Sequence, residues 1–236
     1  MANSVLYNRF FNSSLFHGGT KKTKSFNSLI SLINDKKGFL LLVFANLIVQ
    51  LGITYYTFMK TPATKVTSMQ RFGIILLMFI MIFVLIFPLP SWIKFPLFCL
   101  FSVLQGLFLS MLKTHIDQNM IQLALSGTMS IFVFLFTFAL VLMGFGVYLS
   151  NAFGIFLFWA LLLLILFEVI SIFAGTMNLM RKGFALIGLL IFSLYVIYDT
   201  HTILQRNYFG DFITASLDYY LDILNIFLDV LTLNNN

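Results

Sequence analysis

Long apolar runs, separated by short polar or proline-containing connections, dominate the chain from residue 39 onward. The runs are close to the length of about 20 residues that a helix needs to cross a bilayer. The pattern predicts seven helices, at residues 39–59, 72–87, 95–112, 121–149, 152–174, 183–204 and 215–233. The sequence therefore predicts an all-α seven-helix domain over residues 39–233. A basic, flexible arm precedes it at residues 1–38, and a short polar tail, 234–236, follows it.

The amino-acid composition indicates which environment surrounds these helices. Hydrophobic residues make up 60% of the 236 residues and charged residues only 9%, whereas soluble domains carry about 25% charged residues. This indicates an integral membrane protein. The net charge of +6 is ascribed to juxtamembrane lysines and not to nucleic-acid binding, because no basic extramembrane domain is present. Cys99 is the only cysteine, so no disulfide can form within the chain.

Two features at the ends of the chain leave alternatives open. Phe26, Leu29, Ile30 and Ile33 have the spacing of a short amphipathic helix on the membrane surface, but the same stretch fits an unstructured arm. With the arm on the inner side, the fourteen lysines and arginines divide eight to six between the two sides, and the arm alone carries the excess. The positive-inside rule therefore orients the domain only weakly. The last helix either crosses the membrane or enters and leaves on one side.

The last apolar run carries four polar groups on one stripe. With Asp218 at zero on a helix that advances 100° per residue, Asp222 lies at about +40°, Asn225 at about −20° and Asp229 at about +20°. Ionisable groups in a membrane segment are costly and normally face the bundle interior or a wet cavity. The stripe therefore indicates a functional site. The alternative for Asp218 and Asp229 is a position near the two membrane surfaces.

Further polar residues lie within the other predicted spans. Glu168 falls in the middle of residues 152–174 and Asp199 in residues 183–204, with no deep lysine or arginine to neutralise them. Two carboxylates that face each other away from water share a proton. Asn46 and Gln50, one helical turn apart, are interpreted as hydrogen-bonding residues that join helices.

Enzymatic signatures are missing from the sequence. It contains no Gly-x-Ser-x-Gly elbow, phosphate loop, His-Glu-x-x-His or Cys-x-x-Cys. The three histidines, His17, His115 and His201, have no helical spacing that would join them in a metal site. The sequence predicts a protein that is not an enzyme and has no cofactor.

Two motifs near the carboxyl end resemble a known family. Tyr198-Asp199-Thr200, followed by Tyr220-Leu221-Asp222-Ile223-Leu224-Asn225, resembles the signature of the transmembrane Bax inhibitor-1 family. Residues 43–54 are similar to the family's first span. Lys94-Phe95-Pro96 and the Gln105-Gly106 region resemble its third span, in the Golgi anti-apoptotic and lifeguard-like branch.

The resemblance implies six transmembrane helices around a central carboxyl-terminal seventh. It also implies a pH-sensitive calcium leak through an intracellular membrane and suppression of cell death, with Asp199 and Asp222 as a hydrogen-bonded pair that senses pH. Gln105 departs from the pattern, because branch members often carry glutamate there. Glu168 matches no position of the family.

The residues and the resemblance lead to one hypothesis: Asp199 and Asp222 share a proton that holds the last two helices together, and a change in protonation opens a path for calcium. Asp218, Asn225 and Asp229 are candidate sites along that path, together with Glu168 and Gln105. Calcium prefers several oxygen ligands, and the few oxygens here favour passage over tight binding.

Two other functions stay open. A non-conducting protein that regulates cell-death factors through helix contacts would not need the deep acids. A proton-coupled transporter would use them, but the sequence lacks clear paired broken helices. The expected partners are membrane lipid, calcium ions and membrane proteins of cell-death control. The expected membrane is the Golgi or endoplasmic reticulum in a eukaryotic or viral setting, and the inner membrane in a bacterium.

Overall fold

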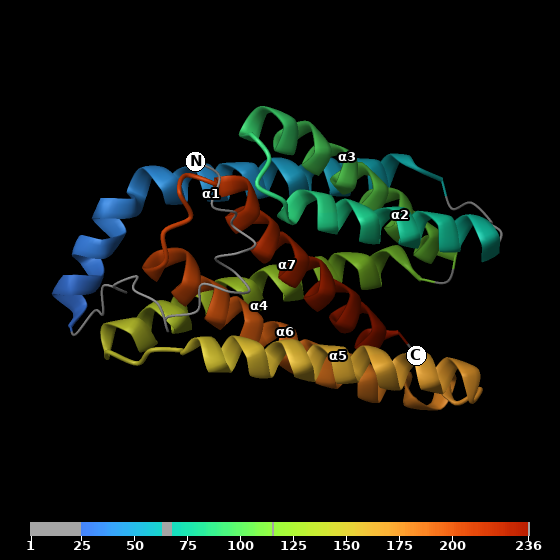
Figure 1. Ribbon diagram of the computed structural model, residues 1–236. Helices are drawn as coiled ribbons and strands as arrows, with labels where there is room; N and C mark the ends of the chain where they lie inside the picture. The colour runs from blue at the N-terminus through green and yellow to red at the C-terminus, as the bar shows by residue number, and fades with distance from the viewer. Residues whose placement is uncertain (1–24, 63–67, 115, 236) are drawn as a thin grey trace. The chain divides into compact units, whose positions relative to one another are not determined.

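The computed structural model describes residues 25–62, 68–114 and 116–235. The described residues form seven α-helices and one short 3-10 helix, with no strand among them (Figure 1), which confirms the all-α prediction. The elements, in chain order, are α1 (Phe26–Lys60), α2 (Ser68–Ile86), α3 (Ser91–Ser110), η2 (Met111–Thr114), α4 (Gln118–Gly144), α5 (Asn151–Phe173), α6 (Met177–Gln205) and α7 (Phe212–Asn234).

Five of these helices, α1, α3, α4, α5 and α6, are long and apolar enough to cross a membrane. This confirms the coarse prediction of a multi-pass membrane protein. α2 contains a shorter apolar stretch, Phe72–Ile86. α7 is not one of the five, because three carboxylates interrupt its apolar surface.

The chain divides into two compact units, to both of which α1 and α7 contribute. Unit 1 comprises Lys37–Asp117 and Asn207–Tyr220. In it α2 packs against α3 (Figure 1). α3 also approaches α1 closely at Gly106, where a Cβ atom would come within 2.6 Å of the backbone oxygen of Thr54. A small residue at this position lets the two helix backbones meet.

Unit 2 comprises Gln118–Arg206 together with residues 25–36 and 221–235 of the described chain. α4 and α5 both pack against α6. Gly154 of α5 leaves room for the ring of Tyr198 of α6. Arg206, at the end of α6, donates hydrogen bonds to Asn151 Oδ1 and, over 3.0 Å, to the Tyr198 hydroxyl. These contacts join the start of α5 to the end of α6.

Some helices begin or end at other residues than predicted, because of side-chain packing or because of a glycine with a left-handed backbone conformation. α1 begins at Phe26, inside the segment that the sequence assigned to the arm, because Phe26 packs against Gly144 and Leu29 and Leu32 are buried. The amphipathic stretch is thus the first part of a long helix, while residues 1–24 lie outside the described part of the chain. α4 ends at Gly144, five residues before the predicted end, since Gly146 adopts a left-handed conformation with φ of 78°.

Candidate functional site

The acidic helix α7 begins three residues earlier than predicted because Asp211 caps it. The Oδ1 atom of Asp211 accepts a hydrogen bond of 3.0 Å from the backbone N–H of Thr214, which is the usual arrangement of an aspartate N-cap. Just before it, Phe209 and Gly210 have φ angles of 51° and 83° and reverse the chain direction. α7 then runs without interruption to Asn234. Its four polar groups therefore share one face, as the helical spacing predicts.

Asp218 is buried in unit 1 and 7% exposed. Its Oδ2 atom accepts a hydrogen bond of 3.3 Å from the hydroxyl of Tyr208, which lies in the connection between α6 and α7. The sequence did not indicate Tyr208 as a partner of Asp218. Tyr208 lies in an irregular segment, and helical spacing does not determine the path of such a segment.

Asp199 and Asp222 both belong to unit 2, and both are buried, with 8% and 4% of their surfaces exposed. Asp199 lies in the last third of α6 and Asp222 in the middle of α7. The structure thus places the two predicted pH-sensing residues in one unit and out of water. The proton that they are expected to share stays a prediction.

Asp229 and Glu168, which the sequence did not connect, interact electrostatically in unit 2. The Asp229 carboxylate lies directly against Gly188 of α6, where a built Cβ atom would be 2.7 Å from Oδ2. No described residue donates a hydrogen bond to that oxygen, which is buried. Gly188 allows this approach, and a glycine within an apolar run gave no sequence signal of its role.

The other two candidates differ in their surroundings. Asn225 is half-buried and donates a hydrogen bond of 2.8 Å to the backbone oxygen of Leu221, one turn earlier in α7. Gln105 of α3 is half-buried beside Gly106. The Asn225 side chain therefore hydrogen-bonds within its own helix. Gln105 stays a candidate only because of its position in α3.

A buried polar cluster joins α1, α3 and α7 within unit 1. Asn46 donates to Ser216 Oγ over 2.5 Å, Gln50 donates to Asn46 Oδ1 over 3.1 Å, and Ser102 donates to Gln50 Oε1 over 2.8 Å. Thr54 Oγ1 and the Tyr220 hydroxyl share a further hydrogen bond of 2.5 Å. The prediction that Asn46 and Gln50 join helices through hydrogen bonds is confirmed.

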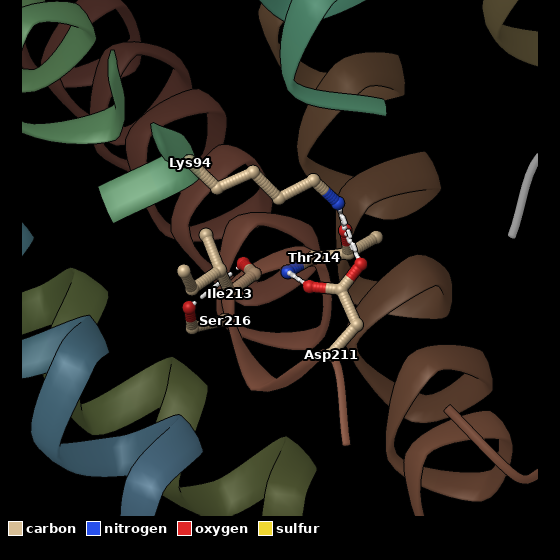
Figure 2. Close-up of polar contacts among 5 residues, drawn as sticks. All are labelled: Lys94, Asp211, Ile213, Thr214 and Ser216. Carbon is tan, nitrogen blue, oxygen red and sulfur yellow. Dashed lines mark hydrogen bonds and ion pairs between the residues drawn. The ribbon is translucent and has the colours of Figure 1, made fainter. Parts of the chain in front are cut away.

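The sequence did not predict a second polar group of unit 1, at the start of α7. Figure 2 shows the Lys94 side chain of α3 reaching Asp211 and Thr214. Lys94 Nζ lies 2.5 Å from Asp211 Oδ2 and 2.7 Å from Thr214 Oγ1. Lys94 was expected in a loop that precedes the third span. It is instead part of α3, with its side chain buried.

The comparisons with known proteins support the family resemblance. Residues 36–236 match the family model of the inhibitors of apoptosis-promoting Bax1. The Golgi anti-apoptotic protein of Vaccinia virus strain Lister is 32% identical over 139 residues, 58% of this chain and 56% of that protein. Bax inhibitor 1 of Schizosaccharomyces pombe is 34% identical over 134 residues, 56% of this chain and 48% of that protein.

A plant relative matches over a shorter region. Protein LIFEGUARD 4 of Arabidopsis thaliana is 39% identical over 85 residues, 35% of this chain and 34% of that protein. The aligned regions thus span between about a third and just over half the length of these relatives. The family model, in contrast, covers α2 to α7 and most of α1. The chain therefore belongs to the Bax inhibitor-1 family.

Proposed function

We propose that this protein is a pH-sensitive calcium leak of an intracellular membrane and that it suppresses cell death. Family membership and the names of the relatives, Bax inhibitor 1 and Golgi anti-apoptotic protein, support the role in cell death, and the second name supports a location in the Golgi. The endoplasmic reticulum is the alternative membrane. In this proposal six helices surround α7, which carries the acidic stripe. Its partners are membrane lipid, calcium ions and proteins of cell-death control.

The observation that carries the proposal is the burial of Asp199 and Asp222 in the same unit. Burial of a carboxylate is costly, so a buried aspartate within a membrane protein marks a functional site. In this proposal the two carboxyl groups face each other, and two carboxyl groups that face each other away from water favour a state in which one proton is shared. Loss or gain of that proton changes the electrostatic energy between α6 and α7, which is the physical basis for gating.

The remaining acidic groups offer oxygen ligands for a passing cation. Asp218, Asn225 and Asp229 lie on the same face of α7, and Glu168 of α5 adds a further carboxylate that interacts electrostatically with Asp229. Calcium binds carboxylate and amide oxygens and accepts irregular coordination. We assign these residues, with Gln105, to the ion path.

Calcium efflux from liposomes that contain the purified protein, measured from pH 5 to pH 8, tests the proposal. Asn cannot lose a proton in this range, so Asp199→Asn and Asp222→Asn should each flatten the dependence of flux on pH. Asp117→Asn is the matched control, because Asp117 is exposed in the connection before α4 and undergoes the same chemical change. An unaltered pH profile in both buried variants would rule out gating by the pair.

The same experiment separates the proposal from the non-conducting alternative. No flux above that of empty liposomes, together with cell protection that survives Asp222→Asn, would favour a protein that regulates cell-death factors through helix contacts. Proton movement that depends on an added substrate would instead indicate a transporter.

A further inference from the structure

Lys94, Asp211 and Thr214 form a closed set of polar contacts at the start of α7 (Figure 2). Lys94 Nζ donates to both Asp211 Oδ2 and Thr214 Oγ1, and the Thr214 hydroxyl donates to Asp211 Oδ2 over 2.7 Å. Asp211 Oδ1 at the same time accepts the Thr214 backbone N–H. Both carboxylate oxygens are thus engaged, one in the helix cap and one in the ion pair, which fixes the orientation of the side chain.

The two charges are shielded from water. The side chains of Lys94 and Asp211 are 1% and 14% exposed. A buried ammonium group that loses its counter-charge is strongly unfavourable, whereas removal of both charges can be nearly neutral. The first turn of α7 is therefore joined to α3 by an ion pair. Removal of only one of its two charges is energetically costly.

Trp92, two residues before Lys94, is 76% exposed on the outer surface of α3. Exposed tryptophans of membrane proteins concentrate at the level of the lipid headgroups. This places the start of α3, and with it the ion pair, near one membrane surface. Asp218 follows Asp211 by seven residues, which is about 10 Å along the helix. The ion pair thus lies at the shallow end of the acidic stripe.

We propose that the Lys94–Asp211 ion pair is an anchor that fixes the depth and rotation of α7, which makes Lys94 a positioning residue for the acidic groups on that helix. The positioning role rests on the proposed function, because it concerns ion flux. The anchoring of α7 does not depend on the proposed function. The hydrogen bonds of the Lys94 ammonium group go to Asp211 and Thr214, and neither of these residues is assigned to the ion path.

Labelling of a buried cysteine measures the anchor without any flux assay. In a Cys99→Ser background, Ile213→Cys introduces a thiol at a position that is 1% exposed, and a membrane-impermeant maleimide reports its accessibility in the full-length protein. Lys94→Met should raise the labelling rate. Asp211→Asn should raise it further, by roughly tenfold or more, because Asn can still cap the helix but leaves the lysine charge buried and unpaired.

The double variant Lys94→Met/Asp211→Asn discriminates an ion pair from a simple loss of packing. It should label more slowly than Asp211→Asn alone, because no unpaired charge remains. Lys113→Met, in η2 just after the opposite end of α3, is the control lysine and should leave the rate unchanged. Two results would contradict the anchor. One is an unchanged labelling rate in both single variants, and the other is a labelling rate in the double variant that equals the sum of the two single effects.

Flux then tests the positioning role. Lys94→Met should change the shape of the pH profile of calcium efflux, whereas a merely structural role would lower the flux at every pH by the same factor. An altered labelling rate with an unaltered profile shape would overturn the positioning role. If the unsubstituted protein shows no flux, the proposed function fails, and the labelling rates still decide on the anchor.

Discussion

Gly106 lies where α3 meets α1. A Cβ atom built at Gly106 would be 2.6 Å from the backbone oxygen of Thr54 and 2.6 Å from the Cβ atom of Thr57. Contacts this short force the helix backbones apart. We expect Gly106→Ala to lower the free energy of unfolding by about 1–3 kcal/mol, the usual cost of overpacking. Thermal unfolding in detergent micelles measures the effect.

Gly52, in the same region of α1, provides the control. A Cβ atom at Gly52 has nothing within 4 Å, and alanine favours a helix over glycine by up to about 1 kcal/mol. Gly52→Ala should therefore leave stability unchanged or increase it. Equal destabilisation by both substitutions would contradict a specific role of Gly106 in packing.

At the scale of single elements, Lys36 caps the end of α6. Its Nζ donates to the backbone oxygen of Ile203 over 3.0 Å and to that of Arg206. A cation at this position satisfies carbonyl groups that lack helical partners and interacts favourably with the helix dipole. Lys36→Met should destabilise the protein by about 1 kcal/mol. The midpoint of thermal unfolding is the measurement.

The neighbouring lysine separates capping from a general effect of charge. Lys37 is exposed, whereas Lys36 is half-buried. Lys37→Met removes the same charge one residue away and should leave the unfolding midpoint unchanged. A similar loss in the two variants would mean that the positive charge, and not the contact with α6, stabilises the protein.

The sequence predicted the centres of the helices well, because long apolar runs in a membrane protein have few other folds available. It was wrong where a tertiary contact decides. α1 begins at Phe26 because the Phe26 ring contacts the Phe145 ring and Leu29 is buried, which a polar and basic composition did not reveal. The start of α7 was predicted three residues too late, at residue 215, although Asp211 and Thr214 have the spacing of a helix cap.

The candidate site was predictable to a similar extent. Helical spacing alone placed the polar groups of α7 on one face, and the resemblance supplied Asp199 as the companion of Asp222. The contact between Lys94 and Asp211 spans 117 residues, and the electrostatic interaction between Glu168 and Asp229 joins two different helices. No local pattern encodes such pairings, since they depend on how the helices pack.

At the scale of the whole molecule, α7 decides on which side of the membrane the chain ends. Its 23 residues span about 34 Å, enough to cross a hydrocarbon core of about 30 Å. Most of its side chains are buried from Ile213 to Leu231, so the helix needs no continuous apolar surface towards lipid. We expect α7 to cross the membrane as the seventh span, which places the two ends of the chain on opposite sides.

Protease protection of tagged ends tests this topology. With a cleavable tag at each end of the chain and sealed vesicles of one orientation, an external protease should remove one tag and leave the other intact. Both tags should be removed once detergent has opened the vesicles, which controls for access to the cleavage sites. Loss of both tags from sealed vesicles would mean that α7 enters and leaves on the same side. Asp218 and Asp229 would then lie at similar depths, and the acidic stripe could not form a continuous path across the membrane.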